Sequence, residues 1–165
     1  MKWALLVIDV QKAYFDISPE TARSLSEAIE YINAAIALFR EKGLPVVAIQ
    51  QVDEEENVVP GEPGYELPDE MDILPTDLHI AKTYGNAFTK TSLQHELEAM
   101  DVEGLILTGF CAEYCVLSTY RGAQDLDLKP ILLRGSLASM RSENIPFVES
   151  INDVISYGAL RSFLI

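Results

Sequence analysis

Apolar runs alternate with amphipathic segments along this chain. Residues 3–8 and 44–49 are continuous apolar runs, which are typical of parallel strands buried on both faces. Between them, Ser18 and Pro19 supply a helix N-cap and a first-turn proline. Apolar residues then recur at three- and four-residue steps until Gly43, which is a typical helix stop. This pattern predicts a β-α-β unit with a right-handed crossover over a parallel sheet.

The same alternation continues to the end of the chain. Further apolar runs predict strands at residues 78–81, 105–108, 130–133 and 160–164. Periodic segments predict helices at residues 91–100, 115–124 and 146–157. The order of these elements predicts a single α/β domain spanning residues 1–165. Its three layers are an open parallel sheet and the helices that cover each of its faces.

One long segment breaks the alternation. Residues 52–76 are acidic and rich in proline and glycine, and they show no periodicity. Segments of this length inside a compact domain are either functional loops or disordered. We expect an ordered excursion that carries small surface turns.

The composition limits the classes of binding partner and the cellular compartment that we expect. The net charge is −14, from 26 acidic and 12 basic residues, which argues against nucleic acid and against membrane surfaces as partners. Two cysteines, Cys111 and Cys115, are spaced C-x3-C, which fits neither a disulfide framework nor a metal knuckle. The first apolar run is too short to span a membrane. We therefore expect a cytoplasmic, soluble protein, while the charge balance says little about a small substrate.

Reactive side chains follow three of the predicted strands. Asp9 ends the first strand, Lys82 follows the third, and Cys115 opens the helix after the fourth. Ligands of open parallel sheets bind outside the carboxyl ends of the strands, so these three side chains are expected to meet. Free N–H groups and the dipole at a helix start favour the thiolate of Cys115. The alternatives are a core thiol, a loop-capping aspartate and a solvated lysine.

Together these groups form a workable set for acyl transfer. Asp9 can accept the Cys115 proton, while Lys82 stabilises the thiolate and keeps Asp9 charged. The backbone N–H groups of Cys111 and Cys115 are placed to form an oxyanion hole. No histidine is needed, and we expect His79 to be structural and His95 to be exposed.

Three segments resemble the signature blocks of the isochorismatase-like cysteine hydrolases: residues 7–11 (VIDVQ), 82–88 (KTYGNAF) and 108–116 (TGFCAEYCV). The resemblance implies a catalytic triad of Asp9, Lys82 and Cys115 on a six-stranded parallel sheet. It also implies a non-proline cis bond at Phe110–Cys111, which would aim the Cys111 N–H into the oxyanion hole. A homodimer or a higher homo-oligomer is implied as well.

Departures from the family pattern shape the expected activity. Nicotinamidases of this superfamily hold a metal with an Asp-x-His cluster after the second strand, and residues 50–56 contain no histidine here. A histidine near Gln51 and an acid near Gly135, found in many members, are also absent. We therefore expect no metal and no cofactor. True isochorismatases lack the cysteine nucleophile, so Cys115 speaks against that activity.

The expected function is that of a cysteine-dependent hydrolase, which acts on a small amide, ureido or related C–N substrate through a thioester. The alternative is a catalytically weak or non-catalytic member that serves as a binding or assembly protein. A third reading rests on the spacing C-x5-R from Cys115 to Arg121, which matches the loop of cysteine phosphatases. It is disfavoured because residues 116–120 contain no glycine and because Tyr114 replaces the histidine expected before the cysteine.

Residues that flank the three blocks are candidates for substrate binding. Gln11 can offer an amide hydrogen bond at the end of the first strand. Five aromatic residues can form an apolar wall suited to a small, flat acyl group, although each can equally belong to the core. They are Phe15, Tyr84, Phe88, Phe110 and Tyr114.

Overall fold

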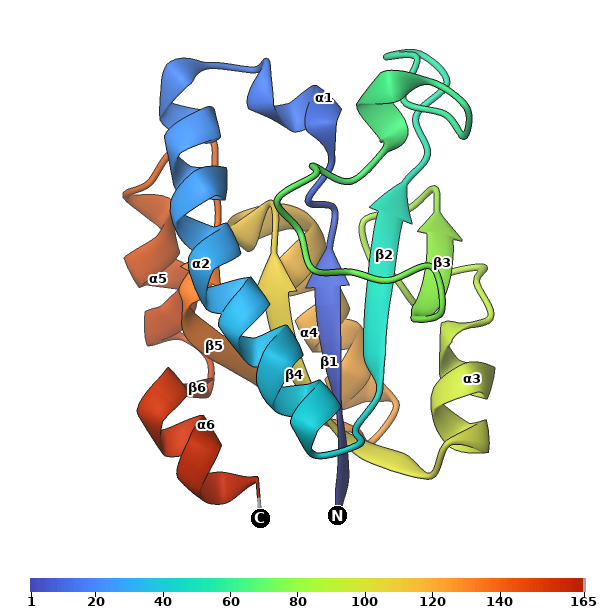
Figure 1. Cartoon of the computed structure of the whole chain (residues 1–165), viewed down its shortest axis with the longest axis vertical. Coiled ribbons are helices and arrows are strands. Elements are labelled where there is room, and N and C mark those ends of the chain that lie inside the picture. Colours follow the sequence, from blue (N-terminus) through green and yellow to red (C-terminus); the bar gives the residue numbers. More distant parts are fainter. Residues whose placement is uncertain (165) are drawn as a thin grey trace.

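The computed structural model describes residues 1–164, which form a parallel sheet with helices on both faces (Figure 1). The strands are β1 (Lys2–Ile8), β2 (Val46–Gln51), β3 (Leu78–Lys82), β4 (Val102–Gly109), β5 (Lys129–Leu137) and β6 (Val154–Ile155). They pair in parallel in the order β3-β2-β1-β4-β5-β6. This confirms the predicted open, six-stranded, three-layer α/β fold. The strand order reverses beside β1, which makes the gap between β1 and β4 a switch point.

The helices of the described residues are divided between the two faces of the sheet. Helices α2 (Pro19–Glu41) and α6 (Tyr157–Phe163) share one hydrophobic cluster, whereas α3 (Leu93–Ala99), α4 (Leu117–Asp125) and α5 (Asn144–Ser150) share the other. Figure 1 shows α2 in front of the sheet and α4 behind it. In β1, Leu5 and Val7 join the α2 cluster, while Leu6 and Ile8 join the opposite one, as expected of a doubly buried strand. Among residues 1–164, no helix is long and apolar enough to cross a membrane.

The C-terminal part of the chain differs from the prediction. Helix α5 ends at Ser150, the last strand has two residues, and residues 157–163, expected to lead into and form a strand, are helical. The Ser156 hydroxyl accepts a hydrogen bond from the Ala159 N–H at 3.2 Å and caps α6. Leu160 and Leu164 are both buried, which is the i, i+4 pattern of one helix face. A short apolar run is ambiguous between the two structures, and the N-cap serine decides in favour of helix.

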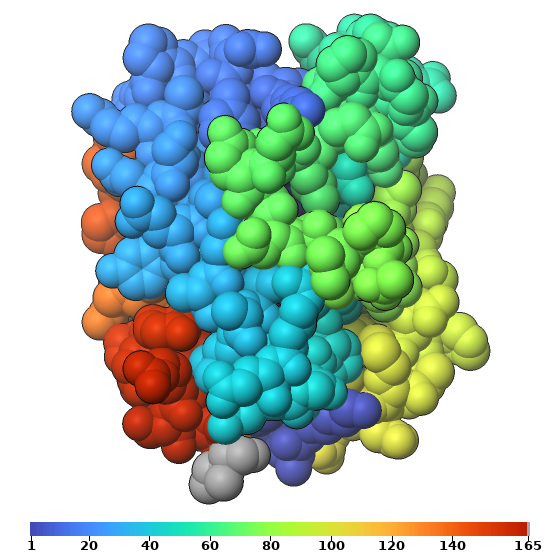
Figure 2. Space-filling model, viewed as in Figure 1, coloured from blue at the N-terminus to red at the C-terminus, as the bar shows by residue number. Residues whose placement is uncertain are grey.

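Residues 52–76 form an ordered excursion, as predicted. Asp53 pairs with Val58 in an antiparallel bridge, and its Oδ1 accepts hydrogen bonds from the Glu55 and Glu56 N–H groups. A 3-10 turn follows at Pro63–Tyr65 and packs against α1 (Lys12–Phe15), a short helix that the sequence did not predict. Figure 2 shows this green segment lying against the blue N-terminal part of the chain. The excursion therefore lies against the segment that follows β1.

Candidate active site

The three reactive side chains predicted from the sequence meet at the carboxyl end of the sheet. Asp9 directly follows β1, Lys82 is the last residue of β3, and Cys115 lies in a π-helical turn (Ala112–Val116) after β4. The Lys82 Nζ lies 3.0 Å from Asp9 Oδ2 and 3.3 Å from Cys115 Sγ. The ammonium group thus touches both the carboxylate and the sulfur.

Asp9 is held in an unusual backbone conformation. Its φ of 53° lies in the left-handed region, and its N–H donates to the Ile49 carbonyl at 2.8 Å. A non-glycine residue pays a conformational cost there, and such strain is concentrated at functional sites. Asp9 Oδ1 is buried and has no hydrogen-bond partner within the described part of the chain. Burial raises the pKa of Asp9, against the opposing effect of the Lys82 charge.

Lys82 reaches Asp9 across the strand that separates them. Gln51 is the register partner of Lys82 in the parallel β2–β3 pair, so their side chains lie on the same face of the sheet. Lys82 Nζ donates to Gln51 Oε1 and, at 2.9 Å, to the Tyr84 carbonyl. The Lys82 side chain has no exposed surface. Gln51 is a site residue that sequence reasoning missed, because the link depends on strand register.

The electrostatics of Cys115 differ from the prediction. The sequence placed it at a helix start that would favour the thiolate, but α4 begins only at Leu117 and Cys115 lies within the preceding π-helical turn. Burial and then the nearby Asp9 carboxylate raise the pKa of Cys115 to about 11, while Lys82 acts in the opposite direction. The thiol is therefore protonated at neutral pH and needs a base, and Asp9 is the carboxylate beside it.

The backbone that leads to Cys115 takes a sharp turn. Gly109 has a φ of 112°, and a Cβ there would lie 2.1 Å from the Ile8 carbonyl oxygen, so only glycine fits. The next peptide bond, Phe110–Cys111, is cis, as the family resemblance implied. The N–H groups of Ala112 and Val116 donate to the Ala138 and Cys111 carbonyls, at 2.9 and 3.2 Å. In residues 1–164 the Cys111 N–H forms no hydrogen bond, so it is free to bind an oxyanion.

A partly buried polar cluster anchors this turn. The Cys111 thiol donates to Glu113 Oε1 at 2.8 Å, and the Ser139 hydroxyl donates to Glu113 Oε2 at 2.8 Å. Burial, followed by the hydrogen bond to Glu113, raises the pKa of Cys111 to about 12. Cys111 is thus an anchoring thiol, and Glu113 and Ser139 are further residues that the sequence did not single out.

Gln11 does not offer its amide to a ligand, contrary to the prediction. Its side chain is fully buried, and Nε2 donates to the carbonyls of Gln51 and Tyr65 at 3.0 and 3.1 Å. Oε1 accepts from the Gln51 N–H at 2.8 Å. Gln50 Nε2 also donates to the Tyr65 carbonyl, at 2.9 Å. Gln11 therefore joins the ends of β1 and β2 to the excursion.

The five predicted aromatic residues do not form one wall. Phe110 is buried against Tyr14, with ring centroids 5.0 Å apart, and Phe15 is half-buried against the same cluster. Phe88 packs against the cluster on the opposite face of the sheet. Tyr84 and Tyr114 are exposed, at 46% and 60%. Tyr14, which sequence reasoning passed over, packs against Phe110, and burial, followed by the charges of Asp9 and Cys115, raises its pKa.

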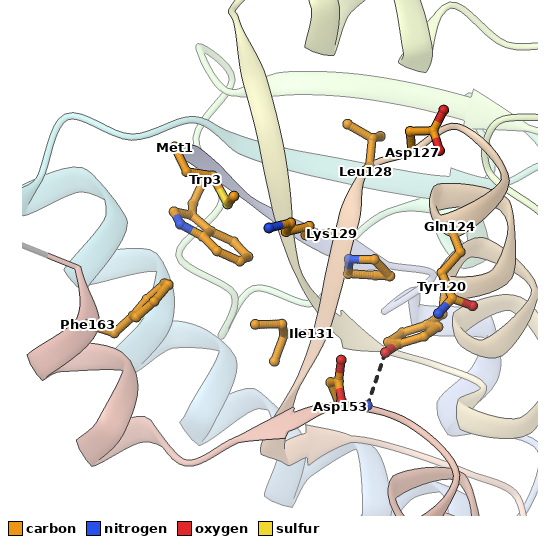
Figure 3. A pocket seen from close by; sticks show the side chains of 11 residues that line it. Met1, Trp3, Tyr120, Gln124, Asp127, Leu128, Lys129, Ile131, Asp153 and Phe163 are labelled. Carbon is orange, nitrogen blue, oxygen red and sulfur yellow. Dashed lines mark hydrogen bonds between the residues drawn. The ribbon is translucent and has the colours of Figure 1, made fainter.

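A hollow of about 660 Å³ lies elsewhere on the molecule (Figure 3). It is lined by Trp3 at the start of β1, by Lys129, Pro130 and Ile131 at the start of β5, and by Tyr120 of α4. These positions are at the amino ends of the strands, opposite to the edge that carries Cys115. The hollow is therefore separate from the candidate active site.

The remaining predicted groups stand apart from this site. His79 Nε2 lies 3.0 Å from the Leu74 carbonyl, and His95 is exposed on α3. Over the described range, no three His, Cys, Asp or Glu side chains gather closely enough to hold a metal ion. Arg121 is an exposed residue of α4 that donates to Gln124 at 3.0 Å. Because residues 117–125 are helical, the phosphatase-loop reading is wrong.

Fold and site together define an α/β protein with a cysteine, a lysine and an aspartate at its switch point. The isochorismatase domain family matches residues 3–146, so the chain belongs to the isochorismatase family of hydrolases. The uncharacterized isochorismatase family protein YrdC of Bacillus subtilis is 28% identical over 153 residues, which cover 90% of this chain and 81% of that protein.

Two further comparisons concern an amidohydrolase and a solved structure. Ureidoacrylate amidohydrolase RutB of Cronobacter sakazakii is 27% identical over 166 residues, covering 79% of this chain and 72% of that protein. The crystal structure of an isochorismatase-like hydrolase from Alkaliphilus metalliredigens shares the fold, with a TM-score of 0.90, 21% identity and 99% coverage of both chains.

Proposed function

We propose that this protein is a cysteine-dependent hydrolase that cleaves the C–N bond of a small amide, ureide or related substrate through a thioester. The observation that carries the proposal is the placement of the Lys82 Nζ, 3.0 Å from Asp9 Oδ2 and 3.3 Å from Cys115 Sγ. A nucleophile, a base and a positive charge in mutual contact make up an activated thiol site.

The proposed reaction has two halves. In the first, the Cys115 thiol gives its proton to Asp9 while sulfur attacks the acyl carbon, and the developing oxyanion accepts hydrogen bonds from the Cys111 and Cys115 N–H groups. The C–N bond then breaks as Asp9 returns the proton to the leaving nitrogen. In the second half, water attacks the thioester and gives a proton to Asp9. The C–S bond breaks, and the proton returns to the sulfur.

Two further observations support this assignment. The raised pKa of Cys115 requires that the thiol be deprotonated during the attack, and buried Asp9 is within reach to accept the proton. A relative that covers most of this chain bears the name ureidoacrylate amidohydrolase, and amide hydrolysis is the chemistry that this site suits. The substrate class proposed here is therefore amides and ureides.

A screen against small amides and ureides tests the proposal, with ammonia release and acid release both followed. Cys115→Ser and Asp9→Asn are expected to lose turnover by about 10³-fold or more while remaining folded. Asp16→Asn, which changes an exposed carboxylate directly after α1, serves as the matched control and is expected to retain activity. An acyl adduct on Cys115 in mass spectrometry would identify the thioester.

Normal turnover in Cys115→Ser would refute the thiol mechanism. No turnover on any substrate, together with no adduct and a Cys115 that resists iodoacetamide even at pH 10, would favour a binding or assembly role for the same fold.

A further inference from the structure

The Lys82 ammonium group has more acceptors than donors. It carries three N–H donors. Four acceptors surround it: Asp9 Oδ2, the Tyr84 carbonyl, Gln51 Oε1 and Cys115 Sγ. The three oxygens lie at 3.0 Å or less, whereas the sulfur lies at 3.3 Å. The three oxygens therefore accept the three Lys82 N–H donors, and Cys115 Sγ can only share one of these donors with an oxygen.

Two of the three oxygens cannot lose their hydrogen bond from Lys82 without a cost in free energy. Asp9 is the buried counter-ion of Lys82, and the Tyr84 acceptor is a main-chain oxygen fixed by the backbone. Gln51 differs, because its acceptor is a neutral amide on a partly exposed side chain. The amide also donates weakly, at 3.3 Å, to the neighbouring Val52 carbonyl. Gln51 is thus the replaceable competitor of Cys115 for a Lys82 proton.

We infer that Gln51 is a positioning residue that holds one Lys82 donor away from Cys115 and so keeps the resting sulfur protonated and weakly reactive. During attack, the donor passes from Gln51 to the developing thiolate. The inference deepens the proposed function, since it rests on Cys115 as the nucleophile. It assigns to Gln51 the control of when the thiol becomes reactive.

Other charged or titratable groups also face Cys115. Asp9 comes from the end of β1, Lys82 from β3 and Tyr14 from α1, and the charge of Asp53 in the excursion also acts on Tyr14. None of them contacts Gln51 Oε1 apart from Lys82. A substitution confined to the Gln51 amide therefore changes the Lys82 contacts and leaves the other groups in place.

The test compares the iodoacetamide alkylation rate of Cys115 in the full-length protein across pH 7–10, after subtraction of the rate of Cys115→Ser. Gln51→Leu removes the acceptor and fills its volume with apolar atoms, so Lys82 can donate to sulfur. We expect alkylation at pH 8 to be about fivefold faster, which corresponds to one typical hydrogen bond. Gln51→Glu binds Lys82 more strongly and adds a negative charge, so alkylation is expected to be at least about fivefold slower.

The opposite changes in alkylation rate expected for Gln51→Leu and Gln51→Glu distinguish this role from a structural one. If Gln51 merely supports the fold, both variants will change the rate in the same direction, and that result would overturn the inference. Unchanged rates would overturn it as well. Gln50→Leu is the matched control, because the Gln50 amide binds the Tyr65 carbonyl and not Lys82, and it is expected to keep the parent rate.

Two further checks keep the result interpretable. Gln51→Asn, whose shorter amide cannot reach Lys82, replaces Gln51→Leu if that variant does not fold, and the same acceleration is expected. Alkylation requires no turnover, so failure of the proposed hydrolase activity leaves this measurement intact. A Gln50→Leu effect equal to that of Gln51→Leu would assign the change to the excursion and refute the role of Gln51.

Discussion

Replacing Lys82 with methionine removes a positive charge from a buried ion pair and keeps most of the side-chain volume. The side chains of Lys82 and Asp9 are 0% and 3% exposed, and their charged atoms lie 3.0 Å apart. Removing one partner of such a pair leaves an uncompensated buried charge. This typically costs about 3–5 kcal/mol of folding free energy.

The cost of this variant depends on pH. Loss of Lys82 removes the charge that lowers the pKa of Asp9, so the folded-state pKa, already raised by burial, moves further above the unfolded value. A carboxyl group with a raised folded-state pKa favours folding most at low pH, and this contribution is lost as the pH rises through that pKa. We therefore expect Lys82→Met to be destabilised by about 3–5 kcal/mol at pH 8 and by clearly less at pH 5.

Urea unfolding followed by tryptophan fluorescence measures this difference. Trp3 is the single tryptophan of the chain and is buried, so its emission reports on the core. Lys90→Met is the matched control, because Lys90 is an exposed lysine that donates to the Tyr84 hydroxyl. It should change stability by about 0.5 kcal/mol or less.

The double variant of Lys82→Met with Asp9→Asn removes the stranded charge and is expected to recover part of the loss at pH 8. A loss below about 1 kcal/mol in Lys82→Met, or an equal loss at both pH values, would refute the reasoning.

Two further predictions follow from the site. The alkylation rate of native Cys115 is expected to rise about tenfold per pH unit between pH 7 and 10, because its pKa is raised to about 11, and a plateau below pH 9 in the mass-spectrometric rate would contradict this. Gln11→Leu removes the side-chain hydrogen bonds to the Gln51 N–H and carbonyl and one of the two to the Tyr65 carbonyl, so we expect a loss of about 2–3 kcal/mol in urea unfolding. Faster cleavage of residues 52–76 by a Glu-specific protease is expected in the same variant, and parent-like resistance would show that the excursion does not depend on Gln11.

The sheet and the meeting of three reactive residues could be predicted because both depend on local patterns. Apolar runs mark buried strands, and the carboxyl ends of parallel strands share one edge. Asp9, Lys82 and Cys115 therefore converge without any knowledge of packing. The same logic failed at residues 157–163, where the apolar residues of a short helix resemble a strand and the preceding Ser156 was the overlooked signal.

What could not be predicted depends on contacts across the fold. The Gln51–Lys82 bond follows from strand register, and the Glu113–Ser139 bond joins the π-helical turn to a loop residue 26 positions later. The direction of the Cys115 pKa shift depends on burial, and the helix start that the sequence suggested lies at Leu117 instead. Gln11 was misread for a similar reason, because its partners are main-chain atoms of Gln51 and Tyr65.

The hydrogen bonds that fix the excursion at Tyr65 have a consequence for how this site can evolve. The side-chain amides of Gln11 and Gln50 donate hydrogen bonds to the main-chain carbonyl of Tyr65 in the excursion. Every amino acid carries this acceptor. Exposed side chains along residues 52–76 can therefore vary without breaking these two hydrogen bonds. Selection for new substrates can act on this stretch while the reactive residues beneath it stay in place, and the same separation makes it a suitable segment for loop exchange in protein engineering.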